Sequence, residues 1–262
     1  MPYEFIKVDK KGHLVIVTIN RPEVMNALHP PVSREMDEVF NQFSENPEEW
    51  IAIITGAGDR AFSAGNDLKW QAEHGWEAVL KGVNALKGGS GGITRRFDCY
   101  KPIIAAVNGL ALGGGFELAL ACDIIVAAEN ASFGLPEPRV GLTAVNGIHR
   151  VCRHIPYHLA MGILMTGRRI SAQEAYRFGL INEVVPLEKL MPTAEKWASE
   201  ILECAPLAVR ATKEAAIRAL SVPIEEAIYE VFPGTANLRV SEDFLEGPRA
   251  FAEKRKPQWK GR

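Results

Sequence analysis

Residues 107–123 read VNGLALGGGFELALACD, and three consecutive glycines at 113–115 interrupt an otherwise apolar run. Glycine permits backbone angles and close approaches that a Cβ atom forbids. The residues that follow, 116–120, favour a helix. We therefore predict a turn into a helix N-terminus, whose first N–H groups have no partner within the helix. The positive end of the helix dipole would hold an anionic oxygen there.

Glu117 lies in the first turn of this predicted helix. All the other residues of the helix are apolar, which predicts that it is buried. They include Phe116, Leu118, Ala119 and Leu120. A buried carboxylate needs a partner or a chemical task. Glu117 is therefore either a structural group hydrogen-bonded to backbone at the helix start or a catalytic group.

A second glutamate, Glu137, stands between two prolines in SFGLPEPRVG (132–141). The prolines remove two backbone donors and predict an extended local chain. Three apolar neighbours predict that part of this loop packs inward: Phe133, Leu135 and Val140. Taken alone, Glu137 fits a surface loop equally well. Together with Glu117 it has the composition of a general acid–base pair sharing one water molecule.

A third stretch, ITGAGDRAFSAGNDLKW (54–70), runs from a predicted strand into a glycine turn. Gly65 allows the backbone to approach a ligand closely. The N–H of Asn66 is then a candidate second donor beside that of Gly114, and two such donors make an oxyanion hole. The pattern A-G-x-D by itself is a weak signal, because it occurs more often in an ordinary turn than in a binding site.

The wider pattern indicates an α/β core. Four short apolar runs suit strands buried on both faces, and they fall at 13–20, 50–56, 101–109 and 123–130. A helix is predicted from Pro30, so strands and helices alternate. The glycine-rich stretch within 71–95 predicts a partly helical, mobile insertion. Beyond 147 helices dominate, with a capping box at 171–174 and a further helix from Pro206.

Composition limits the partners. The chain has 262 residues, ample for a buried core, and its net charge of −2 makes nucleic acid an unexpected partner. The N-terminal residues lack signal-peptide features, and no stretch reaches the roughly 18 apolar residues of a membrane span. Four separated cysteines fit a reducing compartment, so we expect a soluble, cytoplasmic protein. The basic tail EKRKPQWKGR (253–262) is either a solvated end or a contact for a polyanionic ligand.

These stretches together resemble the crotonase, or enoyl-CoA hydratase, superfamily. The resemblance covers nearly the whole chain and rests on six segments in order: INRPEVMNAL (19–28), AFSAGNDLK (61–69), KPIIAAVNGLALGGGFELALACDIIVA (101–127), ASFGLPEPRVGL (131–142), TGRRISAQEAYRFGLINEVVP (166–186) and AFAEKRKPQW (250–259).

The resemblance implies a spiral of β-β-α turns over residues 1–195 and a C-terminal helical region, 196–262, through which such proteins form trimers that pair into hexamers. It implies an acyl-CoA thioester as the ligand. Coenzyme A is then part of the substrate, and neither a separate cofactor nor a metal is expected.

The resemblance also implies roles for particular residues. The thioester oxygen would accept hydrogen bonds from the backbone N–H groups of Asn66 and Gly114. Acids stand at both glutamate positions in the hydratases of this family, so Glu117 and Glu137 predict hydration of a trans-2-enoyl-CoA or the reverse dehydration. The expected coenzyme A contacts are Glu23, Val24, Met25, Ala64, Asp67, Leu68 and Lys254.

The chain departs from the common hydratases at TAVNGIHRV (143–151), where a proline and a glycine are missing. The changed segment forms either a repacked loop or a changed pocket in which Asn146 presents a polar group to the acyl chain. Phe116 and Trp70 are bulky side chains predicted near that chain. Some segments also resemble carnitinyl-CoA dehydratases and hydroxycinnamoyl-CoA hydratase-lyases, so these substrates stay open, as do isomerisation, retro-aldol cleavage and an RNA-binding protein with idle chemistry.

Overall fold

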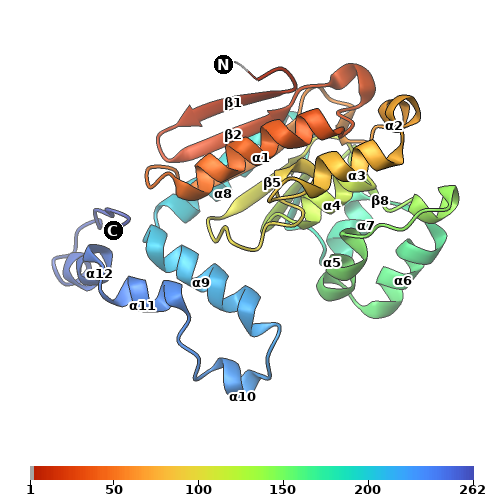
Figure 1. Cartoon of the computed structure of the whole chain (residues 1–262). Helices are drawn as coiled ribbons and strands as arrows, with labels where there is room; N and C mark the ends of the chain where they lie inside the picture. The colour runs from red at the N-terminus through yellow and green to blue at the C-terminus, as the bar shows by residue number, and fades with distance from the viewer. Residues whose placement is uncertain (1–2) are drawn as a thin grey trace.

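The computed structural model describes residues 3–262 and contains two β-sheets with helices packed around them (Figure 1). The larger sheet has six strands. β1 pairs antiparallel with β2, and the other neighbours are parallel. The strand order is β1 (Ile6–Lys11), β2 (Leu14–Ile19), β3 (Ile51–Gly56), β5 (Ile103–Val107), β7 (Ile124–Ala128) and β10 (Glu183–Val185).

The smaller sheet has four short strands, and the chain reaches it by repeated turns of a spiral. Its order is β4 (Ala61–Ser63), β6 (Leu110–Leu112), β8 (Ser132–Gly134) and β9 (Arg169–Ser171). Each turn gives one strand to the large sheet and the next to the small one: β3 then β4, β5 then β6, β7 then β8. The expected spiral of β-β-α turns is confirmed.

Burial on both faces explains the continuous apolar runs of the large sheet. On one face Val15, Val17 and Ile54 join the main core with α1 (Pro30–Glu45). On the other face Ile16, Ile53 and Ile104 pack against α8 (Leu190–Leu202). A strand covered by helices on both sides has no solvent-facing positions, so alternation of polar residues is lost. All four predicted strands are present.

The remaining helices cover the sheets or extend from them. They are α2 (Leu68–His74), α3 (Trp76–Asn84), α4 (Gly114–Leu120), α5 (Gly147–His154), α6 (Tyr157–Thr166), α7 (Ala172–Arg177), α9 (Pro206–Ala219), α10 (Ile224–Ala227), α11 (Pro233–Arg239) and α12 (Glu242–Ala252), with 3-10 turns η1 (Pro22–Val24), η2 (Ser90–Gly92), η3 (Glu137–Val140) and η4 (Leu187–Lys189). The predicted capping box at Ser171 and Glu174 is formed, and α9 begins at the predicted Pro206.

The glycine-rich stretch predicted to be a mobile insertion is instead packed into the molecule. Gly88 N–H donates to Asp37 Oδ1 at 2.7 Å, and Gly91 N–H donates to Ser33 Oγ at 3.2 Å. A Cβ on Gly92 would lie 2.6 Å from the backbone N of Asp37. The glycines therefore serve close packing against α1, which composition alone does not distinguish from flexibility.

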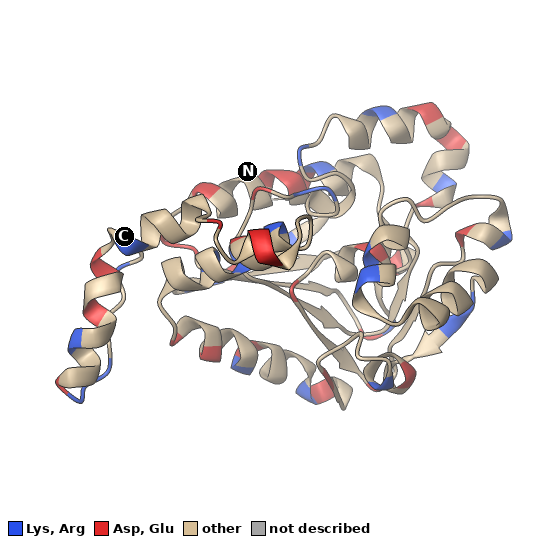
Figure 2. Cartoon of the chain, turned by 90° about the horizontal axis from the view of Figure 1, so that it is seen from below, with Lys and Arg blue, Asp and Glu red and all other residues tan. Residues whose placement is uncertain are grey.

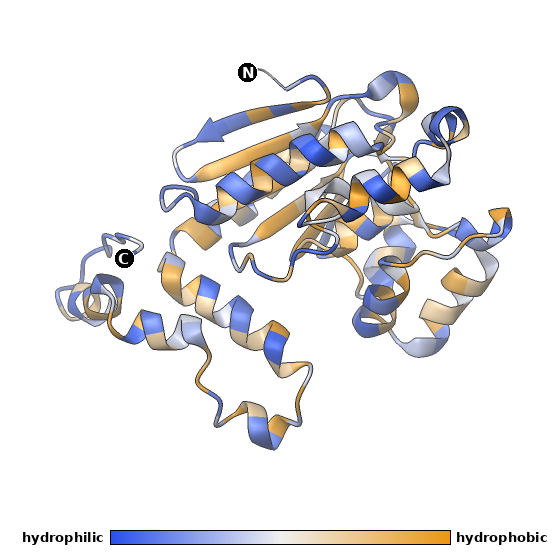
Figure 3. Cartoon of the chain, viewed as in Figure 1, coloured by the Kyte–Doolittle hydropathy of each residue, from blue (hydrophilic) through white to orange (hydrophobic). Residues whose placement is uncertain are grey.

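The C-terminal helices stand apart from the spiral (Figure 1) and expose large apolar side chains, seen as orange segments on α10 and α12 in Figure 3. The most exposed are Leu220, Ile224, Ile228, Tyr229, Val240 and Phe251. Figure 2 shows acidic and basic residues interspersed along the helices. Within residues 3–262, none of the helices has the length and hydropathy needed to cross a bilayer.

Candidate active site

Glu117 is held by backbone donors at the start of the next helix. Its side chain is buried in α4, and its Oε1 accepts hydrogen bonds from the N–H groups of Asn146 (2.9 Å) and Gly147 (2.8 Å). Asn146 Nδ2 also donates to Oε2 at 3.4 Å. Three donors to one carboxyl group fix its orientation.

The predicted pair of backbone donors is brought together beside this glutamate. Gly113 has a positive φ of 52° at the turn into α4, and Gly65 has φ of 87° on the facing segment. A Cβ on Gly65 would lie 2.9 Å from the N of Gly114, and one on Gly114 would lie 3.7 Å from the N of Asn66. Only glycine permits this close approach.

A short bridge holds the second donor in place. Leu28 N–H donates to Gly65 O at 2.7 Å, and Asp67 N–H donates to Leu28 O at 2.9 Å, so Asn66 is fixed between two backbone bonds. Among residues 3–262, neither the N–H of Asn66 nor that of Gly114 has a protein acceptor. The two donors have the composition of an oxyanion hole.

Glu137 lies beside the same glycine turn. The predicted extended chain is wrong here, because Glu137 opens the 3-10 turn η3. The proline φ near −65° suits such a turn as well as an extended strand, so proline alone could not decide. A Cβ on Gly113 would lie 3.0 Å from Glu137 Oε1, which places the carboxyl group over the glycine turn.

The surroundings of Glu137 favour its protonated form. Within the described chain, its Oε2 is buried and has no hydrogen-bond partner. The pKa of Glu137 is raised to about 7, mainly by burial and to a smaller extent by the nearby charge of Glu117. One carboxyl group held by three donors thus lies near one whose pKa is raised to about 7. This arrangement can accept a proton at one position and donate one at the other.

Some predicted coenzyme A contacts lie together beside the oxyanion donors. Met25 is left-handed (φ 58°) at the end of η1, and its carbonyl oxygen accepts the N–H of Ala64 at 2.9 Å. Glu23 and Leu68 are exposed nearby in the chain. Asp67 is already engaged: it caps α2 through the N–H of Trp70 and pairs with Arg21 at 2.8 Å.

The residues predicted around the acyl chain have different environments. Phe116 is fully buried against Phe133, with ring centroids 5.3 Å apart, so its side chain belongs to the core. Trp70 is half-buried and stacks on His74. Asn146 faces Glu117 rather than open space. Lys254 is exposed beyond α12, which lies on the far side of the molecule from α4 (Figure 1).

Three partners of the site were missing from the sequence prediction. Gly147 holds Glu117 through its backbone N–H, Arg21 holds the cap of α2, and the His29 ring, whose pKa burial lowers to about 4, lies edge-on to Trp70. Asn146-Gly147 is a typical turn dipeptide. That signal locates a turn, but it does not reveal which carboxylate the turn faces.

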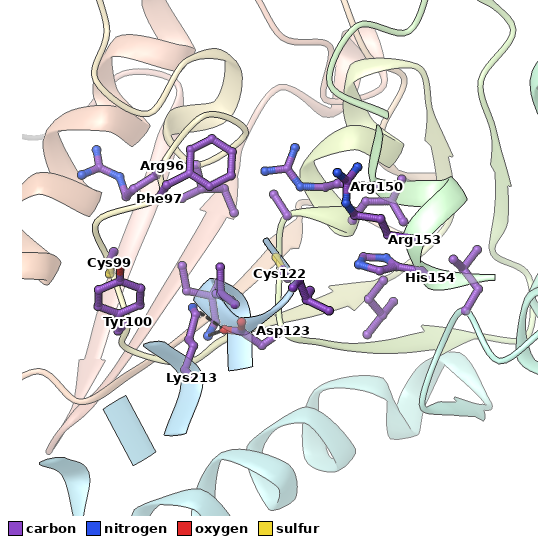
Figure 4. Close-up of a pocket in the computed structure, with 18 of the residues that line it drawn as sticks. Arg96, Phe97, Cys99, Tyr100, Cys122, Asp123, Arg150, Arg153, His154 and Lys213 are labelled. Atoms are coloured by element: carbon purple, nitrogen blue, oxygen red, sulfur yellow. Dashed lines mark hydrogen bonds and ion pairs between the residues drawn. The ribbon is translucent and has the colours of Figure 1, made fainter. Parts of the chain in front are cut away.

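A separate cavity of about 610 Å³ lies at the other end of α4 (Figure 4). Cys122 and Asp123 line it from the end of α4, and Arg150, Arg153 and His154 line it from α5. Asp123 forms an ion pair with Lys213 at 2.6 Å. The cavity therefore adjoins the back of the helix whose N-terminus carries the site. Residues 3–262 contain no group of His, Cys, Asp or Glu arranged to hold a metal ion.

Comparison with known proteins identifies the family. The enoyl-CoA hydratase/isomerase family model matches residues 9–262. The chain belongs to this family. Carnitinyl-CoA dehydratases of Citrobacter koseri and of Salmonella enteritidis are each 44% identical over 99% of this chain and 99% of their own length.

Solved structures of the enoyl-CoA hydratase/isomerase family agree with the fold. The enoyl-CoA hydratase of Bacillus anthracis has a TM-score of 0.92 at 37% identity and covers 99% of this chain and 100% of its own. The enoyl-CoA hydratase of Mycobacterium tuberculosis has a TM-score of 0.90 at 36% identity, with 100% of both chains covered. The expected superfamily is confirmed, and with it the coarser function, a crotonase-family enzyme that hydrates or dehydrates CoA thioesters.

Proposed function

We propose that this protein is an enoyl-CoA hydratase, which adds water reversibly across the double bond of a trans-2-enoyl-CoA. One observation carries the proposal: a donor-held carboxylate, Glu117, and a carboxyl group of raised pKa, Glu137, flank the same glycine turn. An isomerase needs only one acid to move a proton. Two acids in such different surroundings suit the addition of water, which needs a base and an acid at once.

The proposed mechanism begins at the two backbone donors. The N–H groups of Asn66 and Gly114 hold the thioester oxygen and stabilise the negative charge that grows there, each contributing roughly 3–4 kcal/mol to lowering the barrier. Glu117 orients the water and accepts its proton as oxygen bonds to the β-carbon. Glu137 donates its proton to the α-carbon. The reverse sequence dehydrates a 3-hydroxyacyl-CoA.

The coenzyme A part of the substrate is proposed to lie along 23–25, Ala64 and Leu68, which border the oxyanion donors. We also propose a homo-oligomer, a trimer or a dimer of trimers. The exposed apolar side chains of α10 and α12 support this assembly, because such surfaces are rarely left in water. A partner subunit would then bring Lys254 near the phosphates. Sedimentation velocity tests the assembly directly.

A second candidate is carnitinyl-CoA dehydration, which the 44% identical relatives favour. Both candidates use the same pair of acids and differ in the acyl group. The test is incubation with enoyl-CoA thioesters bearing short, long, aryl and trimethylammonium acyl groups in deuterated water, followed by product mass analysis. Gain of one water with deuterium at the α-carbon is expected. A shifted double bond or a shortened acyl chain without added water would contradict the proposal.

A further inference from the structure

Arg95 is presented by a rigid loop at the edge of the active site. Its backbone N–H donates to Gly88 O at 2.8 Å, which closes the loop on itself. Thr94 Oγ1 donates to Ser90 O at 2.8 Å, and Asp37 holds the N–H of Gly88 from α1. The glycines of this loop are packed against neighbouring elements, so the backbone beneath Arg95 has little room to move.

Two adjacent arginines in this loop have opposite surroundings. Arg96 is buried, pairs with Asp37 at 2.8 Å and donates to Asn41 at 2.8 Å, so its charge is neutralised inside the fold. Arg95 is exposed, and among residues 3–262 no carboxylate forms an ion pair with it. Its hydrogen-bond acceptors are neutral: Asn84 Oδ1 at 2.6 Å and Asn146 Oδ1 at 3.5 Å.

The same Asn146 connects Arg95 to the reacting groups. Its Oδ1 faces Arg95, and its Nδ2 donates to Glu117 Oε2 at 3.4 Å. One side chain therefore separates a fixed guanidinium group from the carboxylate proposed to activate water. A substituent on the acyl group, a few bonds beyond the β-carbon, would come within reach of Arg95. A guanidinium oriented by two amide oxygens is preorganised for a carboxylate.

We propose that Arg95 binds a second carboxylate on the acyl group, so that the preferred substrate is an enoyl-CoA whose acyl chain ends in a carboxylate. This inference rests on the proposed hydratase function and assigns its substrate class. A trimethylammonium acyl group would meet a like charge at Arg95, which disfavours it. The substrate class therefore differs from that named for the carnitinyl-CoA dehydratases that this chain resembles.

The test compares acyl groups of different charge. Hydration of glutaconyl-CoA, which ends in a carboxylate, is measured against 2-pentenoyl-CoA, a neutral thioester of the same carbon number, and crotonobetainyl-CoA, which carries a trimethylammonium group. We expect the ratio of kcat/KM for glutaconyl-CoA over 2-pentenoyl-CoA to fall roughly 10- to 100-fold in Arg95→Ala, the size of one charge-assisted hydrogen bond. Arg95→Lys retains the charge and should keep part of the preference.

The matched control is Arg177→Ala, which removes an exposed arginine from α7 and should leave the ratio unchanged. An equal loss for all three substrates in Arg95→Ala would overturn the proposal, because Arg95 would then act only through Asn146 on Glu117. A wild-type preference for the neutral or the trimethylammonium thioester would overturn it as well.

Binding of unreactive thioesters separates this inference from the proposed function. Glutaryl-CoA and pentanoyl-CoA are saturated, so their affinities, measured by calorimetry, do not depend on hydration. Tighter binding of glutaryl-CoA that is lost in Arg95→Ala supports the site even if none of the enoyl-CoAs is hydrated. Equal affinities of the two thioesters would reject it even if hydration of 2-pentenoyl-CoA is rapid.

Discussion

The two glutamates of the site are chemically identical side chains in opposite environments. Glu117 lies in a helix and accepts hydrogen bonds from two backbone N–H groups and from one side-chain amide. Glu137 is set in a 3-10 turn, and its buried Oε2 has no partner in the described chain. Donors stabilise a carboxylate, whereas burial without donors stabilises the neutral acid.

The comparison shows that backbone placement alone gives two identical side chains different surroundings. The N–H groups of Asn146 and Gly147 are aimed at one glutamate and not at the other. The two environments therefore differ although the two residues are of the same type. The following predictions test this difference, beginning with the variants that should change activity most.

Replacing either glutamate by glutamine should nearly abolish hydration. Glu117→Gln removes the base and Glu137→Gln removes the acid, and each general acid or base typically contributes about 10²–10⁴-fold. The loss of enoyl absorbance with crotonyl-CoA measures kcat. The double variant should lose far less than the product of the single losses, because the two groups act as a unit. Full activity in either single variant would contradict the catalytic role proposed for that glutamate.

Gly65→Ala should separate the two oxyanion donors. The new Cβ would lie 2.5 Å from Leu112 O and 2.9 Å from the N of Gly114, so the facing segments must move apart. Loss of one such donor costs about 10²–10³-fold in kcat. Gly12→Ala is the matched control, because Gly12 also has a positive φ but nothing within 4 Å of its Cβ position. A similar loss of activity in both variants would attribute the effect to backbone strain.

The pH dependence of hydration should report the proton on Glu137. Its pKa is raised to about 7, and only the protonated form donates to the α-carbon. The rate should therefore level off just below this pH and fall roughly tenfold per unit above it. Dehydration should show the same basic limb in kcat/KM, since the overall reaction releases no proton. A hydration rate that stays flat from pH 6 to 9 would show that Glu137 is not the acid.

The smallest expected difference is in stability. Glu117→Gln weakens charge-assisted hydrogen bonds in the buried site and should cost about 1–3 kcal/mol of unfolding free energy. Glu137→Gln replaces a half-buried acid without a partner for Oε2, so its effect should stay within roughly 0.5 kcal/mol. Urea unfolding followed by circular dichroism compares the two midpoints. A larger loss of unfolding free energy in Glu137→Gln than in Glu117→Gln would contradict the assigned difference between the two environments.

The sequence by itself determined the α/β class, the four long strands and the helix starts at Pro30, Ser171 and Pro206. These follow from local rules of apolar patterning, proline geometry and capping, and such rules act within a few residues. It also located both glutamates and the glycine turns. The family resemblance added the spiral order of the strands.

Only the tertiary structure decided what each of these residues faces. Glu117 meets donors almost thirty residues further along the chain, and Gly65 meets Gly114 because β4 and β6, the strands that precede them, pair in the smaller sheet. The same packing turns the glycine-rich stretch into a tight loop, sets Phe116 against Phe133 and leaves Arg95 without a carboxylate partner among residues 3–262. Contacts between distant segments depend on the register of the whole spiral, which short-range sequence patterns do not encode.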